Sequence, residues 1–97
     1  MSDKIPLLVL NTHSREHQAV LAELYDLIYA PTDGERAAAI ATHGAKFRAV
    51  LTIGVLGLTA QEMVVMPALE LICCIGAGYE RVDLEAARAR GSVVANG

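Results

Sequence analysis

Apolar runs of strand length recur at fairly even spacing along the chain. They cover residues 7–10, 26–30, 48–53, 69–75 and 92–95. Most of these runs are continuous rather than alternating, and continuous Val, Ile and Leu runs are typical of strands buried on both faces. Such strands occur in parallel sheets that helices cover on each side. The pattern therefore predicts five parallel strands.

The segments between the runs carry helix start and stop signals. Residues that can cap a helix N-terminus precede each of four segments: Ser14, Thr32 or Asp33, Thr59, and Asp83. Residues that end helices follow three of them: Gly44, Pro67 and Gly91. Thr59 and Glu62 have the spacing of a capping box. With right-handed crossovers, this order predicts an α/β fold with a flavodoxin-like, doubly wound, parallel five-stranded sheet.

Composition and charge narrow the possible partners. The chain has 97 residues, a hydrophobic content of 54% and a net charge of −3, with no cluster of Lys or Arg. It therefore lacks the electrostatic footprint of a nucleic-acid or anionic-membrane partner. The most apolar stretch, residues 63–79, is interrupted by Pro67 and Glu70 and is shorter than the roughly 20 residues that cross a bilayer. No export signal is visible, so we expect a cytoplasmic protein.

The two cysteines, Cys73 and Cys74, are neighbours within one apolar run. Successive side chains of a strand point to opposite faces, so these thiols cannot easily form a disulfide. We expect both to be reduced and buried.

Loops after strands are the places where open parallel sheets bind ligands. Three predicted loops qualify: residues 11–13, 54–57 and 76–78. Glycines in the last two allow backbone amides to approach an anion closely. The same glycines could serve only to make tight turns. From the residues alone, both interpretations stay open.

Other candidate sites are weak. His13 and His17 are four residues apart and could share a helix face as metal ligands do, but no Cys or carboxylate is evidently placed to complete the set. A solvated helix start is the favoured interpretation. The run from Gly76 begins like a dinucleotide fingerprint, yet Arg81 occupies the third glycine position. We therefore assign no metal site, no cofactor-binding residues and no catalytic residues within the chain.

A longer pattern in the second half adds a resemblance. Residues 69–96 combine an apolar strand, a Gly-x-Gly-type loop, Asp-Leu, Ala-Ala-Arg-x-x-Gly and a Val-x-Asn strand. This order resembles the end of the N-terminal segment of D-isomer-specific 2-hydroxyacid dehydrogenases. Upstream, residues 49–57 and the helix after Thr59 are similar to the preceding strand and loop of that family.

The resemblance implies a particular domain organisation. Residues 1–97 would form the N-terminal segment of a substrate-binding (catalytic) domain that both ends of the chain build together. A Rossmann domain that binds NAD or NADP would follow Gly97, together with the catalytic Arg, Glu and His, so the fragment alone is expected to be inactive. The parent would be an oxidoreductase, a homodimer that interconverts a 2-oxo acid and a D-2-hydroxy acid, as glyoxylate and hydroxypyruvate reductases do.

The resemblance also implies which loops bind substrate. The amides of Ala77 and Gly78, in the loop that begins at Gly76, would hold the substrate carboxylate. The loop after the third strand would line the other wall with Ile53, Gly54 and Val55. The chain departs from the family pattern at Glu80, where Asp is common, and at Tyr79, which is bulkier than the usual aliphatic residue.

Two alternatives come from other functional classes. A free-standing flavodoxin-like signalling receiver or binding module would need clustered acidic residues after the first strand and an Asp at the end of the third. The chain has Asn11-Thr12 and Ile53-Gly54 at those places. A flavin carrier is weakened because few aromatic residues flank the loops.

Overall fold

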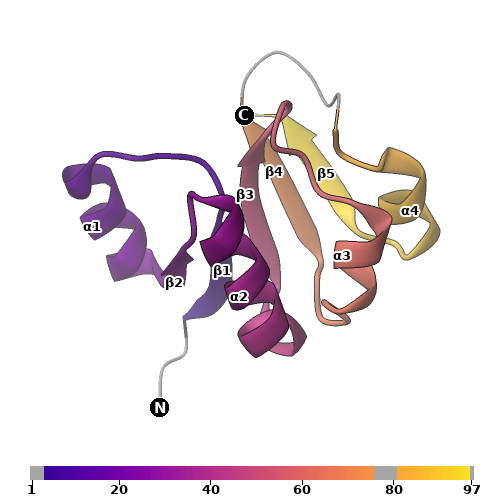
Figure 1. Ribbon diagram of the computed structural model, residues 1–97, viewed down its shortest axis with the longest axis horizontal. Helices are drawn as coiled ribbons and strands as arrows, with labels where there is room; N and C mark the ends of the chain where they lie inside the picture. Colours follow the sequence, from indigo (N-terminus) through magenta and orange to yellow (C-terminus); the bar gives the residue numbers. More distant parts are fainter. Residues whose placement is uncertain (1–3, 76–80, 97) are drawn as a thin grey trace.

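The sheet and its helices follow the predicted order. The computed structural model describes residues 4–75 and 81–96. The elements are β1 (Ile5–Val9), α1 (Arg15–Leu24), β2 (Tyr25–Tyr29), α2 (Asp33–His43), the 3₁₀ turn η1 (Gly44–Lys46), β3 (Ala49–Ile53), α3 (Ala60–Val64), β4 (Leu71–Ile75), α4 (Leu84–Ala89) and β5 (Val93–Asn96). All neighbouring strands are parallel, in the order β2-β1-β3-β4-β5. This is the doubly wound, flavodoxin-like order that the sequence predicts (Figure 1).

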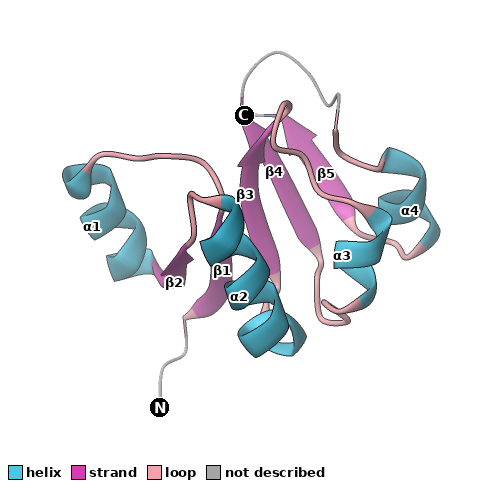
Figure 2. Cartoon of the chain, viewed as in Figure 1, coloured by secondary structure: helices cyan, strands magenta, loops and turns pink. Residues whose placement is uncertain are grey.

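The helices divide unequally between the two faces of the sheet. Helices α2, α3 and α4 lie together on one face, whereas α1 lies on the other (Figure 2). The cause is the strand order, because the chain runs outward from β1 to β2 and then back past β1 to β3. A right-handed crossover places the helix on opposite faces for these two directions. The reversal between β1 and β3 is the topological switch point of the sheet.

The helix caps confirm the start signals read from the sequence. The side chains of Ser14, Thr32 and Asp83 accept hydrogen bonds from amides in the first turns of α1, α2 and α4. Thr59 and Glu62 form the complete capping box at α3. Helix α4 ends before Gly91, whose φ of 79° is the left-handed conformation expected after a helix C-terminus.

The face under α2, α3 and α4 holds the larger core. Fifteen buried side chains form one cluster there: Leu8, Leu10, Ala30, Ala39, Ile40, Phe47, Val50, Leu58, Met63, Met66, Leu69, Ile72, Cys74, Val82 and Ala87. Four buried residues form the cluster on the α1 face: Leu7, Val9, Ala49 and Leu51. On this second face Leu71 is 39% exposed and Val93 is 61% exposed. The expected burial of every strand on both faces is therefore only partly realised among the described residues.

The cysteines follow the pleat of β4. Neither of the two forms a disulfide; Cys74 is buried in the larger core, and Cys73 is half-buried on the α1 face. The expected placement on opposite faces is confirmed, but of the two side chains only that of Cys74 is fully buried. Among the residues that the structure describes, no helix is long and apolar enough to cross a membrane.

Candidate functional site

The turn between β3 and α3 lies where the fold favours ligand binding, at the carboxyl end of a strand beside the switch point. The amides of Leu56 and Gly57 donate to the carbonyl oxygen of Ile53, at 3.1 and 2.8 Å. Gly54 and Val55 are therefore the central residues of the turn, and their amides do not make the bonds that close it. Gly54 is buried and Val55 is 63% exposed. The predicted site residues at positions 53–55 thus form one turn at this edge of the sheet.

Gly57 shows why this turn needs glycine. Its φ is +58°, and a Cβ added there would lie 1.9 Å from the carbonyl oxygen of Arg81. The amide of Leu58 donates to that same carbonyl at 2.9 Å, and the Arg81 amide donates to the Gly54 carbonyl at 3.0 Å. Gly57 therefore permits a close approach of two chain segments, and the space beside it is filled by protein rather than left for a ligand.

These bonds link the β3–α3 turn to the segment that begins at Arg81. Residues 81–83, which follow the β4 loop, pair with the β3–α3 turn through Arg81, and through an isolated parallel bridge between Leu58 and Val82. Gly76, Ala77 and Gly78 lie outside the described residues. Their role as the carboxylate-binding loop stays a prediction.

Arg36, which sequence reasoning did not single out, holds the same turn from the side of α2. Its Nε and Nη2 donate to the two carboxylate oxygens of Glu62, at 2.7 and 2.6 Å. Its Nη1 and Nη2 also donate to the carbonyl oxygens of Leu56 and Gly57, at 2.9 and 3.2 Å. The partners are 20 to 26 residues away in sequence, so no local signal could reveal them.

The Glu62 carboxylate is held ionised by its neighbours. Burial raises the pKa of Glu62, but hydrogen bonds from Arg36 and Thr59, with the charge of Arg36, outweigh burial and leave the pKa below its ordinary value. The Thr59 amide donates to Oε1 at 2.9 Å, completing the capping box. One carboxylate therefore both starts α3 and anchors the guanidinium of Arg36.

The loop after β1 carries the histidine pair. The Nδ1 atoms of His13 and His17 are 2.7 Å apart, so one ring donates to the other. The His13 amide donates to the Tyr29 hydroxyl at 3.0 Å, and Gln18 Nε2 donates to the His13 carbonyl at 2.9 Å. Burial and the charge of His17 lower the pKa of His13. In the described ranges, no third His, Cys, Asp or Glu joins this pair to make a metal site.

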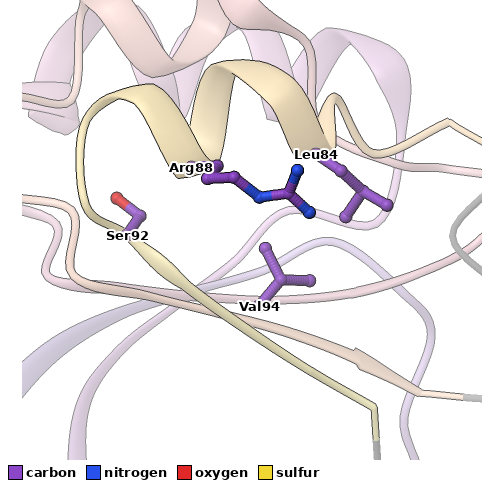
Figure 3. A pocket seen from close by; sticks show the side chains of 4 residues that line it. All are labelled: Leu84, Arg88, Ser92 and Val94. Carbon is purple, nitrogen blue, oxygen red and sulfur yellow. The ribbon is translucent and has the colours of Figure 1, made fainter.

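A hollow of about 300 Å³ lies between α4 and β5. Figure 3 shows its lining, in which Arg88 extends along α4 above Val94, with Leu84 and Ser92 at either side. The Ser92 hydroxyl already donates to the Leu69 carbonyl at 2.8 Å. Arg88 is thus the one charged group among these four lining residues, and they do not fit a dinucleotide cofactor.

Comparison with known proteins identifies the family. The profile of the D-isomer specific 2-hydroxyacid dehydrogenase family, catalytic domain, matches residues 7–97. The chain belongs to this family. The matched range of this 2-hydroxyacid dehydrogenase segment includes the β3–α3 turn and residues 76–78.

Solved structures agree with the family match. A 2-hydroxyacid dehydrogenase from Ketogulonicigenium vulgare Y25 is 35% identical, with a TM-score of 0.83 over 94% of this chain. A dehydrogenase from Rhizobium meliloti is 30% identical, with a TM-score of 0.73 over 90% of the chain. A glyoxylate reductase from Paecilomyes thermophila shares the fold at 17% identity, with a TM-score of 0.76 over 98% of the chain.

The 2-hydroxyacid dehydrogenase segment is short beside these proteins. It spans 29%, 31% and 32% of the three chains, respectively. A comparison with curated proteins gave no match.

Proposed function

We propose that this chain is the N-terminal segment of the substrate-binding domain of an NAD(P)-dependent enzyme that interconverts a 2-oxo acid and a D-2-hydroxy acid. The observation that carries the proposal is the family match over residues 7–97. The 35% identity to the dehydrogenase from Ketogulonicigenium vulgare Y25 supports it. Glyoxylate and hydroxypyruvate are the substrates we would test first.

Within that enzyme, this chain binds the substrate. The β3–α3 turn, with Ile53, Gly54 and Val55, forms one wall, and the amides of Ala77 and Gly78 hold the carboxylate. The hydrogen bonds between Arg81 and the β3–α3 turn support this pairing of loops, because they bring the segment after residue 80 to the turn. Hydride transfer belongs to NAD or NADP and to catalytic residues outside residues 1–97.

The proposal extends to the arrangement of the parent enzyme. Its Rossmann domain follows this segment, and the far end of the parent chain returns to complete the substrate-binding domain. The exposure of Leu71 and Val93 on the α1 face supports a further covering segment. We also propose that the parent is a cytoplasmic homodimer, which fractionation and sedimentation would test.

The first experiment measures the activity of the full-length protein. We expect oxidation of NADH or NADPH when glyoxylate or hydroxypyruvate is added, and no such activity from residues 1–97 alone. A full-length protein that is folded and binds reduced nicotinamide, yet reduces no 2-oxo acid, would contradict the proposed function. Saturable NADH binding by the 97-residue chain at micromolar affinity would contradict the proposal that the cofactor binds outside residues 1–97.

A second experiment tests the carboxylate-binding loop. Ala77→Pro removes one backbone donor, whereas Ala77→Val keeps it. A charge-assisted hydrogen bond contributes about 1.5–3 kcal/mol, so the KM for the 2-oxo acid should rise about ten- to hundredfold in Ala77→Pro. It should change little in Ala77→Val, and the affinity for NAD(P)H should stay near normal in both. A folded Ala77→Pro enzyme with unchanged KM would show that the carboxylate is held elsewhere.

A further inference from the structure

We propose that Arg36 is a positioning residue for the substrate-binding turn at residues 53–57. It holds the turn through two backbone carbonyls while Glu62 fixes the orientation of its guanidinium. The inference rests on the proposed function, because that function makes this turn a wall of the substrate site.

Arg36 makes more contacts than a surface ion pair does. We call Arg36 and Glu62, with the two turn carbonyls that Arg36 holds, the clamp. One guanidinium donates to both carboxylate oxygens of Glu62 and to two successive carbonyls, those of Leu56 and Gly57. The side chains of Arg36 and Glu62 are only 15% and 22% exposed. Because the guanidinium is planar and its donors are fixed in a fork, the bidentate pair with Glu62 sets the direction of the remaining donors. Helix α2, the turn and helix α3 are thus joined at one group.

The carbonyls that Arg36 holds belong to the second half of the turn. The buried hydroxyl of Thr52 donates to the Gly57 carbonyl at 3.1 Å, and Arg36 donates to the same oxygen. The Gly54 carbonyl, in the first half, accepts the Arg81 amide. Val55 lies between these anchors and is exposed. Releasing the Arg36 anchor would remove its bond to the Leu56 carbonyl and leave the Gly57 carbonyl to Thr52, so this half of the turn would be held less firmly.

A lysine cannot replace this arrangement. Its ammonium is a point charge that donates along freely rotating bonds, so it cannot present two parallel bonds to Glu62 and also reach both carbonyls. The hydrogen bonds and charge that lower the pKa of Glu62 keep its carboxylate charged at neutral pH. Arg36→Lys therefore keeps the charge balance of the cluster but removes the paired hydrogen bonds of the guanidinium. This makes it the sharpest single test.

The test uses the full-length enzyme with glyoxylate or hydroxypyruvate as substrate, and oxamate, an unreactive analogue of a 2-oxo acid, as binding probe. For Arg36→Lys we expect the KM for the 2-oxo acid and the Kd for oxamate to rise about tenfold. The kcat should change less than about threefold, and the KM for NAD(P)H should stay unchanged. Glu62→Gln, which loosens the guanidinium without removing it, should shift the KM in the same direction by less.

Arg48→Gln is the matched control. Arg48 makes an Arg–Glu contact of the same length, 2.6 Å from Nε to Glu70, but it lies just before β3, at the opposite end of that strand from the turn. This variant should leave both KM values unchanged. Thermal unfolding of each variant shows whether it is folded at the assay temperature. If Arg36→Lys does not fold, Glu62→Gln supplies the same comparison.

The outcomes separate the two levels of the proposal. A folded wild-type enzyme that reduces no 2-oxo acid overturns the proposed function, and the inference with it. A wild-type enzyme that works, with an Arg36→Lys variant whose KM for the 2-oxo acid is unchanged, overturns the inference alone. An Arg36→Lys variant with a lower kcat, a higher KM for NAD(P)H and a lower thermal stability has a general structural defect. That result also overturns the inference.

Discussion

The two faces of the sheet are built from the same kinds of residue but are covered to different extents. On the face under α2, α3 and α4, Ile72 and Cys74 are completely buried. On the α1 face their chain neighbours in β4, Leu71 and Cys73, are partly exposed. The difference teaches that residue type sets only the capacity for burial. The elements that the chain lays over each face decide whether this capacity is used.

The largest effect should come from truncating adjacent residues of β4 in the 97-residue chain. Ile72→Ala leaves a cavity in a closed core and should lower the free energy of unfolding by about 2–5 kcal/mol. Leu71→Ala removes a side chain that is already 39% exposed, so it should cost about 1 kcal/mol or less. Urea unfolding measures both. Equal costs would show that the α1 face is covered in solution.

The same two substitutions in the full-length protein test whether another part of the parent chain covers the α1 face. If the parent chain supplies a segment that covers the α1 face, the cost of Leu71→Ala should rise toward that of Ile72→Ala. If the two costs stay as far apart as in the 97-residue chain, Leu71 remains exposed in the parent as well.

Thiol labelling provides a second comparison between the faces. Reaction of a thiol reagent with a fully buried cysteine requires the structure to open, whereas a half-buried one can react in the native state. In the 97-residue chain Cys73 should therefore react about a hundredfold faster than Cys74 or more. Cys73→Ser and Cys74→Ser assign the two rates. Similar rates in denaturant would confirm that structure causes the difference, whereas similar rates without denaturant would contradict it.

Much of the fold follows from local signals in the sequence. The caps at Ser14, Thr59 and Asp83 act within one helical turn, so each can be read from a few neighbouring residues. Right-handed crossovers between alternating strands and helices limit the sheet to a few strand orders, of which β2-β1-β3-β4-β5 is one. Strand ends are less certain, because Leu69 lies in the predicted run but is buried in the core before β4 begins at Leu71.

The parts that could not be predicted depend on long-range contacts. The glycine at position 57 is needed because the Arg81 carbonyl approaches it, and nothing near Gly57 in sequence announces that neighbour. Arg36 is one of three charged residues in the first turns of α2, with Asp33 and Glu35, and its role depends on carbonyls some 20 residues away. The exposure of Val93 could not be predicted either, because a continuous apolar run does not say which segment covers it.

As the pH falls, stability should be lost in two steps, first beside α1 and then between α2 and α3. The pKa of His13, beside α1, is lowered by burial and by His17, so the unfolded chain takes up a proton more readily than the folded one. Stability should therefore fall first just below the ordinary histidine pKa of about 6.5. The lowered pKa of Glu62, between α2 and α3, places a second loss just below the ordinary glutamate value of about 4.3.

Urea unfolding as a function of pH measures both losses. His13→Asn should remove the first and leave the second, and Glu62→Gln should do the reverse. Amide hydrogen exchange should show α1 losing protection at a higher pH than α3. A stability that is flat between pH 7 and 5 would contradict the role assigned to His13.

The smallest effect on stability should come from the Arg48–Glu70 pair. It has the same residue types as the Arg36–Glu62 pair, so the two pairs differ in burial rather than in residue type. The Arg48–Glu70 contact is as short as the Arg36–Glu62 contact, 2.6 Å in each case, but its side chains are 49% and 63% exposed. Water and salt screen an exposed pair, and holding two long side chains costs entropy. A double-mutant cycle with Arg48→Gln and Glu70→Gln should therefore give a coupling of about 0–1 kcal/mol that declines with added salt. A coupling well above that range, unchanged by salt, would mean that contact length rather than burial sets the strength of these pairs, and the distinction between clamp and surface contact would fail.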